Sequence, residues 1–400
     1  MPPDQASALR GDLQDQQVAG YQSPLGVTRT TTVSLPGFTT DSGFKFDTVD
    51  VNYQTVGKLS PTRDNAILVC HGLSGNAHLA GTDAVTGRPG WWDFHVGPGK
   101  AIDTDKFFVI ASNTLGGCSG TTGPRSVNPR TGKHFAMDFP PVTVRDMVRA
   151  QEALLDHLGI QRLFAVVGAS MGGMQALTWA VHLPERTRIC LPIATCTAHN
   201  AMQIAFNEIG RQAITTDAHW NGGQYSESRY PAHGLAVARM VGHVTYLSEL
   251  VMARKFGRRR QLDAADKNLF SVESYLHHQG DSFVKRFDPN SYLYLTRAID
   301  DFDLFDGAVP EQALREVRSR FLIISFSSDW LYPPAQSREL VRLLKRAGVA
   351  VTYLNLDSEY GHDSFLIENP PFADVVRHFL NGEYNSPPRP AVAAEPAPVI

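Results

Sequence analysis

The stretch LFAVVGASMGGMQAL, residues 163–177, changes character at its middle. Residues 163–168 form a short apolar run, which is typical of a strand buried on both faces of a sheet. A helical pattern begins at Met171. Between them, in Gly168-Ala169-Ser170-Met171-Gly172, small residues flank a serine where a strand would turn sharply into a helix. Such a turn exposes the serine hydroxyl and directs free backbone N–H groups toward it, so Ser170 is the candidate nucleophile.

Other short apolar runs predict strands of the same kind, at residues 65–70, 107–112, 189–194, 321–326 and 351–356. Helical patterns lie between several of them, at residues 142–158, 171–182 and 334–347. Strand and helix in alternation are typical of a parallel sheet with helices on its faces. We therefore expect an α/β fold with a mostly parallel sheet.

A serine at such a turn needs a general base and an acid that orients the base. In folds of this kind the acid and the histidine follow the serine in that order, each just past a strand. Asp329 follows the run FLIISF, and His362 follows the run VTYLNL. Of 14 histidines, only His362 and His378 come after the last predicted strand, and His378 falls within a closing helix pattern. Asp363 is the competing acid by proximity, but adjacent side chains do not readily meet in triad geometry.

Two backbone N–H groups are expected to stabilise the oxyanion that forms when the serine attacks. One belongs to Met171, the residue after the nucleophile. The other belongs to Leu73 in the loop His71-Gly72-Leu73-Ser74-Gly75, which directly follows the run NAILVC. We expect His71 to support this loop through hydrogen bonds rather than to act as a base.

The chain is predicted to consist of a core that a long insertion divides. Residues 201–306 hold helical runs and no convincing strand, so we interpret them as a mostly helical lid between two parts of the core, residues 21–200 and 307–383. Residues 1–20 are polar and residues 384–400 are rich in proline and alanine. Both ends are predicted to be flexible, because neither can bury enough apolar surface to fold.

The composition indicates an ordinary globular chain, with 42% hydrophobic and 19% charged residues. A net charge of −3 predicts no general attraction to nucleic acid or to an anionic membrane. The apolar runs are far shorter than the roughly 20 residues that span a bilayer. The N-terminus has no apolar segment typical of a secretory signal, and the four cysteines lack the spacing of a metal site or a disulfide framework. We therefore expect a cytoplasmic protein.

Several longer stretches together resemble the homoserine O-acyltransferase family, whose members have the α/β-hydrolase fold and act in methionine biosynthesis. They run from about residue 65 to 380: CHGLSGNAH, PGWWD, GPGKAIDT, NTLGGCSGTTGP, DFPPVTVRDMV, GASMGGMQAL, IAFNEIGRQAI and YGHDSF. The resemblance implies a mostly parallel sheet flanked by helices, with a helical lid insertion. It places the catalytic triad on the same residues, Ser170, Asp329 and His362.

The resemblance also implies how the substrates bind and react. Arg211, in FNEIGRQAI, would bind the carboxylate of an amino-acid acceptor in two-point geometry, and Asp363 would contact its amine. Ser170, deprotonated by His362, would take the acyl group from acyl-CoA, and the hydroxyl of L-homoserine would then accept it. The lid would exclude water. No metal and no cofactor besides the acyl-CoA co-substrate is implied, and the family suggests a homodimer through the lid.

The acyl donor is predicted to be succinyl-CoA, with acetyl-CoA as the alternative. Trp330 directly follows the triad acid, and among relatives a tryptophan at this place looks like the succinyl-using form. Trp330 is therefore the candidate for acyl-CoA specificity. A tryptophan supplies no cation for the succinyl carboxylate, and Arg125, in TTGPRS, is the candidate for that role.

Other functions remain open at this stage. Some relatives acylate serine, so a serine O-acyltransferase is one alternative. An esterase or thioesterase would use the same triad and oxyanion hole, although Arg211 and Asp363 favour an amino-acid acceptor. A non-catalytic binding protein with the hydrolase fold is a third alternative, but such proteins usually lose a triad member, and this chain retains all three.

Overall fold

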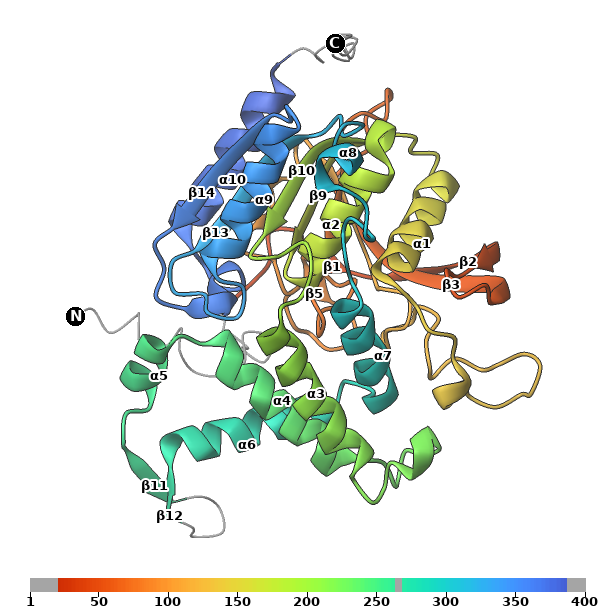
Figure 1. Cartoon of the computed structure of the whole chain (residues 1–400), viewed down its shortest axis with the longest axis vertical. Helices are drawn as coiled ribbons and strands as arrows, with labels where there is room; N and C mark the ends of the chain where they lie inside the picture. The colour runs from red at the N-terminus through yellow and green to blue at the C-terminus, as the bar shows by residue number, and fades with distance from the viewer. Residues whose placement is uncertain (1–20, 263–267, 387–400) are drawn as a thin grey trace.

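The computed structural model describes residues 21–262 and 268–386. The two ends predicted to be flexible lie almost wholly outside these residues. Within them, an eight-stranded sheet forms the centre of the molecule, in the order β14-β13-β10-β9-β4-β8-β3-β2 (Figure 1). The strands are β2 (Thr31–Thr39), β3 (Lys45–Val56), β4 (Ala66–Cys70), β8 (Phe108–Ser112), β9 (Leu163–Ala169), β10 (Thr187–Ile193), β13 (Arg320–Phe326) and β14 (Val351–Leu356).

Pairing is parallel from β14 to β8, whereas β3 pairs antiparallel with both β8 and β2. All the strands predicted from apolar runs are present, with ends that shift by at most two residues. β2 and β3 were not predicted. Their side chains alternate between buried and exposed, because these strands lie at the edge of the sheet, and a search for continuous apolar runs passes over such a pattern.

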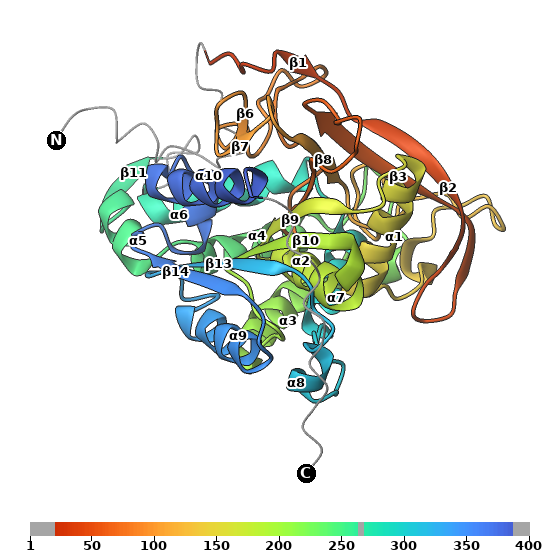
Figure 2. The ribbon, with the colours of Figure 1, turned by 90° about the horizontal axis from the view of Figure 1, so that it is seen from above.

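Helices cover both faces of the sheet (Figure 2). One face is covered by α1 (Val144–His157), α2 (Met171–His182) and α9 (Pro334–Arg346), which share a hydrophobic core that includes Met147, Trp179 and Leu340. The other face is covered by α10 (Pro370–Tyr384), whose Phe372 and Leu380 belong to a second core. The sheet is therefore buried on both faces, as its apolar strands require.

The segment between β10 and β13 is mostly helical, and its residues 201–300 lie at one end of the molecule, in the lower half of Figure 1. It contains α3 (Ala201–Thr215), α4 (Ala232–Tyr246), α5 (Glu249–Lys255), α6 (Ser271–Val284) and α7 (Pro289–Asp300), followed by the short α8 (Pro310–Ala313). We call residues 201–306 the lid. Among residues 21–262 and 268–386, no helix combines the length and the hydropathy that a membrane span requires.

The lid is not free of strands, contrary to the prediction. β11 (Arg260–Leu262) pairs antiparallel with β12 (Asn268–Phe270). These strands are only three residues long and partly polar, so they give no sequence signal. Two-residue strands pair elsewhere, β1 (Val27–Thr28) with β5 (Thr82–Asp83) and β6 (Val96–Gly97) with β7 (Ile102–Asp103). Short 3₁₀ helices are η2 (Ala136–Asp138), η3 (Pro184–Arg186), η4 (Asn221–Gly223) and η5 (Gly361–Phe365).

Candidate active site

Ser170 lies between β9 and α2. Its backbone has φ 56° and ψ −126°, a conformation that residues other than glycine rarely adopt. Strain of this kind persists only where the surrounding structure enforces it. Here the enforcing feature is close packing, since a Cβ added at Gly168 would collide with the Gly172 carbonyl, and one added at Gly172 would collide with the Cys70 carbonyl. The sharp turn expected around the serine is therefore present.

Asp329 and His362 meet beside this turn. Asp329 follows β13, and His362 lies in η5 after β14. His362 Nδ1 lies 2.7 Å from Asp329 Oδ2, and both residues are almost fully buried. The other carboxylate oxygen accepts the backbone N–H groups of Leu331 and Tyr332 at 3.0 and 2.8 Å. Asp329 is thus oriented to accept the Nδ1 proton, which leaves His362 Nε2 as the basic nitrogen.

Tyr332, a residue that the sequence analysis missed, lines the same cavity as Ser170. Its hydroxyl is in side-chain hydrogen-bonding contact with Ser170. Its ring stacks on the His362 ring, with centroids 4.8 Å apart and an interplanar angle of 23°. Burial raises the pKa of Tyr332 well above its usual value, so the phenol keeps its proton. Among the described residues, Ser170 has no direct hydrogen bond to His362, and such bonds are often long before substrate binds.

Behind Tyr332 lies a buried network anchored on Asp300. The Tyr332 hydroxyl is 2.7 Å from His199 Nε2, and His199 Nδ1 is 2.9 Å from Asp300 Oδ1. Asp300 also accepts hydrogen bonds from Asn207 at 2.7 Å and from Arg211 Nη1 at 2.6 Å. Burial opposes ionisation of Asp300, but the hydrogen bonds from His199, Asn207 and Arg211 hold its pKa below the usual range. Asp300 is therefore a carboxylate.

The loop that carries Leu73 is held from two sides. On the core side, His71 Nδ1 lies 2.7 Å from the Gly72 carbonyl, and the Thr114 backbone N–H donates to His71 Nε2. Burial lowers the pKa of His71 to about 4, so it is neutral and supports the loop, as expected. On the lid side, Arg239 donates to the Ser74 hydroxyl at 3.2 Å, and Arg286 donates to the Ser74 carbonyl at 3.0 Å.

A small cavity of about 50 Å³ opens in front of Ser170. Leu73, one of the two predicted oxyanion donors, lines it, and Met171, the other, is the first residue of α2. The other lining residues are His199, Gln203, Phe206, Asn207, Val241, Gly242, Thr245, Tyr246, Tyr292, Ile299, Leu331 and Tyr332. Within the described part of the chain, no lysine or arginine belongs to this lining.

Three predicted substrate residues lie near this cavity but do not line it. Arg211 is buried against Asp300 and Glu208, and it borders a separate groove of about 370 Å³ between α3, α7 and residues 137–143. Asp363 follows His362 in η5. Trp330 is 39% exposed; its Nε1 donates to the Leu247 carbonyl at 3.0 Å, and its ring packs edge-on against Phe206, with centroids 5.7 Å apart. Trp330 therefore contacts the lining of the cavity through Phe206.

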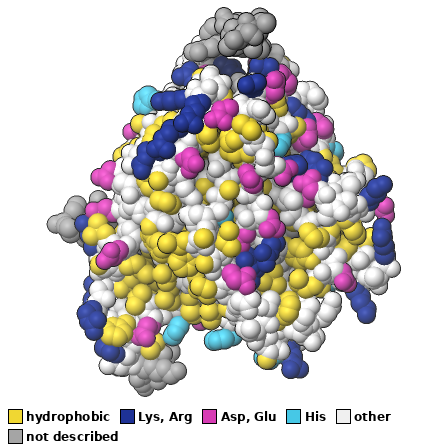
Figure 3. Space-filling view, in the orientation of Figure 1, with side chains coloured by type: hydrophobic (Ala, Val, Ile, Leu, Met, Phe, Trp, Pro, Cys, Tyr) yellow, Lys and Arg dark blue, Asp and Glu magenta, His cyan; other side chains and the backbone are white. Residues whose placement is uncertain are grey.

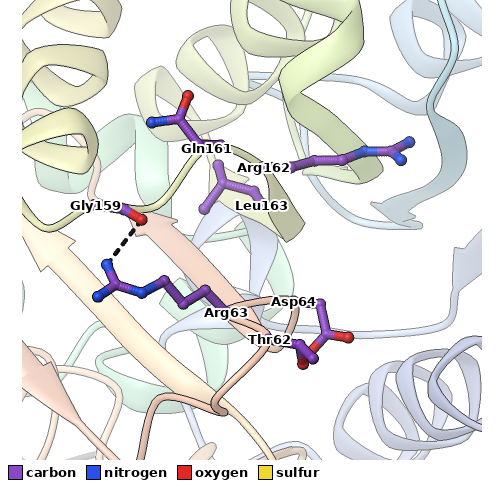
Figure 4. Close-up of a pocket in the computed structure, with 7 residues that line it drawn as sticks. All are labelled: Thr62, Arg63, Asp64, Gly159, Gln161, Arg162 and Leu163. Carbon is purple, nitrogen blue, oxygen red and sulfur yellow. Dashed lines mark hydrogen bonds between the residues drawn. The ribbon is translucent and has the colours of Figure 1, made fainter.

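Arg125, the candidate cation for a succinyl carboxylate, is absent from this cavity. Its side chain is about half exposed and pairs with Glu227 at 3.2 Å. Another groove, of about 220 Å³, is drawn in Figure 4. It lies where β4 and β9 begin, and Arg63 donates there to the Gly159 carbonyl at 2.9 Å. Open α/β sheets bind ligands at the carboxyl ends of their strands, so this groove is at the wrong edge for catalysis.

Comparisons with known proteins identify the fold and the family of this chain. Residues 65–369 match the family model of the alpha/beta hydrolase fold. The homoserine O-acetyltransferase of Rhodospirillum rubrum is 52% identical over 368 residues, which cover 90% of this chain and 93% of that protein. The homoserine O-acetyltransferase of Gluconobacter oxydans is 53% identical over 361 residues, 86% of this chain and 91% of that protein.

Solved structures of similar proteins have the same fold. The crystal structure of homoserine O-acetyltransferase from Bacillus anthracis matches with a TM-score of 0.83 and 32% identity, over 89% of this chain and 98% of that one. The crystal structure of esterase E22 matches with a TM-score of 0.81 and 33% identity, over 88% of this chain and 99% of that one. The fold, the strained serine and the relatives lead to one conclusion: this chain belongs to the homoserine O-acyltransferase family of α/β-hydrolase-fold proteins.

Proposed function

We propose that this chain is an acetyl-CoA-dependent homoserine O-acetyltransferase that forms O-acetyl-L-homoserine for methionine biosynthesis. The observation that carries the proposal is the 52% identity, over 90% of this chain, to a homoserine O-acetyltransferase. The sequence analysis favoured succinyl-CoA because of Trp330. The relatives do not support that preference, and the acetyl alternative takes its place.

The cavity supports the acetyl donor on physical grounds. Its walls near Ser170 are apolar or uncharged, and no lysine or arginine among the described residues lines it. A succinyl group would place a carboxylate in this space, and a buried charge without a cation is strongly unfavourable. An acetyl group carries no charge and adds little volume. A tryptophan beside the triad acid is thus compatible with acetyl transfer.

The proposed reaction proceeds through an acetyl-enzyme. His362 takes the Ser170 proton while Ser170 Oγ attacks the thioester, and the N–H groups of Leu73 and Met171 stabilise the oxyanion. CoA leaves with a proton from His362. The hydroxyl of L-homoserine then attacks the acetyl carbonyl with His362 again as the base, and Ser170 is regenerated. Asp329 holds His362 in the required tautomer throughout.

For the acceptor, we propose that Arg211 binds the homoserine carboxylate and that Asp363 contacts its ammonium. Arg211 contacts Glu208 through Nε and Nη2 and Asp300 through Nη1, and each Nη atom has a second N–H group for a carboxylate. Asp363 is next to the base His362, so an ammonium there would place the acceptor close to the reacting atoms. Both assignments follow from the family pattern.

An esterase is the second candidate function, because esterase E22 shares the fold over 99% of its length. The same triad and oxyanion hole would hydrolyse an ester if water replaced homoserine as the acceptor. The two functions differ only in the second half of the reaction. They are therefore separated by asking what removes the acetyl group from Ser170.

The decisive experiment offers the purified protein an equimolar mixture of acetyl-CoA and succinyl-CoA, together with homoserine and serine. Products are identified by mass spectrometry, and CoA release is followed with and without each amino acid. We expect O-acetylhomoserine as the main product and CoA release that depends on homoserine. O-succinylhomoserine as the main product would restore the succinyl donor, whereas CoA release independent of both amino acids would favour a hydrolase.

The homodimer that the family pattern implies is a further proposal. Exposed hydrophobic side chains lie on the lid helices and beside the triad acid, namely Met202, Ile204, Ile209, Val244, Leu250 and Trp330. Figure 3 shows hydrophobic side chains gathered over the lower half of the molecule, where the lid lies. A second copy covering this face would bury them. Light scattering on the purified chain should give twice the 43.9 kDa mass of one chain.

A further inference from the structure

A second chain of buried hydrogen bonds reaches Ser170, separate from the triad. It begins at Asp300, the last residue of α7 in the lid, passes through His199, and ends at the Tyr332 hydroxyl, which contacts the Ser170 side chain. The two links from His199 measure 2.9 Å to Asp300 and 2.7 Å to Tyr332. The side chains of His199 and Asp300 are 4% and 3% exposed, so water does not compete for these bonds.

The charge of Asp300 fixes the direction of the first of these hydrogen bonds. A carboxylate only accepts, so His199 Nδ1–H donates to Asp300. We assign the 2.7 Å contact between Tyr332 and His199 Nε2 to the Tyr332 hydroxyl as donor, because Nδ1 carries the proton that Asp300 accepts and Tyr332 keeps its own proton. The Tyr332 oxygen then presents only lone pairs to Ser170. It must therefore accept a hydrogen bond from any hydroxyl group at that place.

We propose that Tyr332, held by His199 and Asp300, positions the reacting hydroxyl in both halves of acyl transfer at Ser170, which rests on the proposed function. In the free protein Tyr332 accepts the Ser170 O–H. In the acetyl-enzyme the Ser170 oxygen has no proton, and the same lone pair accepts the O–H of the incoming acceptor. The acceptor oxygen bonds to the acetyl carbon, the bond from that carbon to Ser170 Oγ breaks, and the acceptor proton passes through His362 to Ser170 Oγ.

The geometry suits this role because the turn after β13 holds Tyr332 and also the acid that orients His362. Asp329 Oδ1 accepts the backbone N–H of Tyr332 at 2.8 Å, so the triad acid and Tyr332 are fixed together. The Tyr332 ring stacks on the His362 ring at 4.8 Å. A hydroxyl held by the Tyr332 oxygen therefore lies next to the base that takes its proton.

Tyr332→Phe tests the proposal, since it removes the oxygen and keeps the ring that stacks on His362. CoA release in the first turnover measures acylation, and the decay of the acetyl-enzyme at increasing homoserine measures transfer. We expect CoA release that keeps an amplitude of about one per active site but forms more slowly, and a maximal decay rate that falls about 10- to 100-fold. The half-saturating homoserine concentration should change little. Tyr353→Phe is the matched control, because it removes a hydroxyl on β14 that is hydrogen-bonded to Ser325 on β13 and does not contact Ser170.

A pair of substitutions tests the supporting residue. In His199→Gln the side-chain carbonyl can still accept the Tyr332 proton, whereas His199→Leu offers no acceptor. We expect His199→Gln to retain several-fold more of the decay rate than His199→Leu. A packing role alone would not separate the two variants in this order. Equal decay rates in both, at equal melting temperatures, would overturn the assignment of His199.

The outcomes also separate this proposal from the proposed function. An unchanged acetyl-enzyme decay in Tyr332→Phe overturns the inference. So does a loss of the burst and of the melting temperature together, because that indicates a structural role. If the wild-type acetyl-enzyme decays equally with and without homoserine, the proposed function fails. The inference then stands only if Tyr332→Phe still slows the decay by water, since water is an acceptor hydroxyl as well.

Discussion

The core and the lid bury different kinds of groups. In the core, the strands around Ser170 are almost wholly apolar, and β4 and β9 are buried along their entire length. In the lid, buried charged groups pair with one another and with the core, as Arg211 does with Asp300 and as Arg239 does with Ser74. The core therefore holds the nucleophile and the oxyanion donors rigidly. The lid brings polar groups to the cavity in front of Ser170, where we propose that the acceptor binds.

This difference explains how one fold serves two chemistries. Esterase E22 and the homoserine O-acetyltransferase of Bacillus anthracis match this chain almost equally well, with TM-scores of 0.81 and 0.83. The triad and the oxyanion hole are sufficient for either ester hydrolysis or acyl transfer. The choice between water and an amino acid must then depend on groups around the cavity. Substitutions in the core should abolish both reactions, whereas lid substitutions should change the acceptor step.

The largest effect is expected for Ser170→Ala. Without the serine oxygen no acetyl-enzyme forms, so the turnover number should fall by about 10⁴-fold or more and the CoA burst should vanish. The substitution is small, and thermal melting should change little. Ser34→Ala, on the exposed face of edge strand β2, is the control and should keep full activity. A well-folded Ser170→Ala protein with substantial activity would contradict the triad assignment.

Acid is expected to destabilise the core through two buried histidines. Burial lowers the pKa of His71 and of His95 to about 4 each. In the unfolded chain a histidine has a pKa of about 6.5. Between about pH 6.5 and 4, each of these histidines is therefore protonated in the unfolded chain but not in the folded chain. The free energy of unfolding should therefore fall as pH decreases through this window, by about 3 kcal/mol for each histidine, and neither contributes above it.

Urea unfolding at several pH values between 7 and 4 measures how the free energy of unfolding changes with pH, which we call the pH slope. His95→Phe removes one of these groups and should reduce the loss of unfolding free energy between pH 7 and pH 4 by about 3 kcal/mol, because a phenylalanine fits among Trp92, Phe94 and Phe372 without a titrating nitrogen. His278→Phe, on the exposed surface of lid helix α6, should leave the slope unchanged. If both variants follow the wild-type slope, other groups dominate the acid response.

The parts that could be predicted from sequence are those built from contiguous residues. Buried parallel strands must be apolar at every position, so β9 and its neighbours stand out as runs, and the nucleophile turn adds a spaced pattern of small residues. Asp329 and His362 were predictable because each directly follows a strand. Strands β2 and β3 were missed, since fewer than half of their residues are buried.

The chain from Asp300 to Tyr332 could not be predicted in the same way. Its members stand at positions 199, 300 and 332, and only the packing of the lid on the core brings them together. No spacing links them in the sequence. The one available signal was local: His199 follows a strand as His362 does, and Tyr332 lies three residues after the triad acid. Arg211 was found by resemblance, but its pairing with Asp300 was not foreseen.

Arg211→Lys should affect the second half of the reaction, in which homoserine accepts the acetyl group. It keeps the charge and loses two-point binding of a carboxylate, so the half-saturating homoserine concentration should rise about 10- to 100-fold while the CoA burst survives. Arg297→Lys, exposed on α7, is the matched control. If Arg211 acts only by anchoring Asp300, the maximal decay rate of the acetyl-enzyme should fall and the half-saturating concentration should not change. The two parameters thus distinguish binding from positioning.

The smallest effect is expected for Trp330→Leu, at the junction of core and lid. Trp330 does not line the cavity but packs on Phe206, which does. Leucine should let Phe206 move and admit a larger acyl group, but it supplies no cation for a succinyl carboxylate. The ratio of kcat/KM for acetyl-CoA to that for succinyl-CoA should therefore fall by about 3- to 10-fold, near the lower end of what one reshaped pocket contact achieves. The ratio is the proper measure, because lost stability lowers both values together. An unchanged ratio would show that Trp330 has no part in donor choice, and a reversal to succinyl-CoA would show that Trp330 alone excludes it.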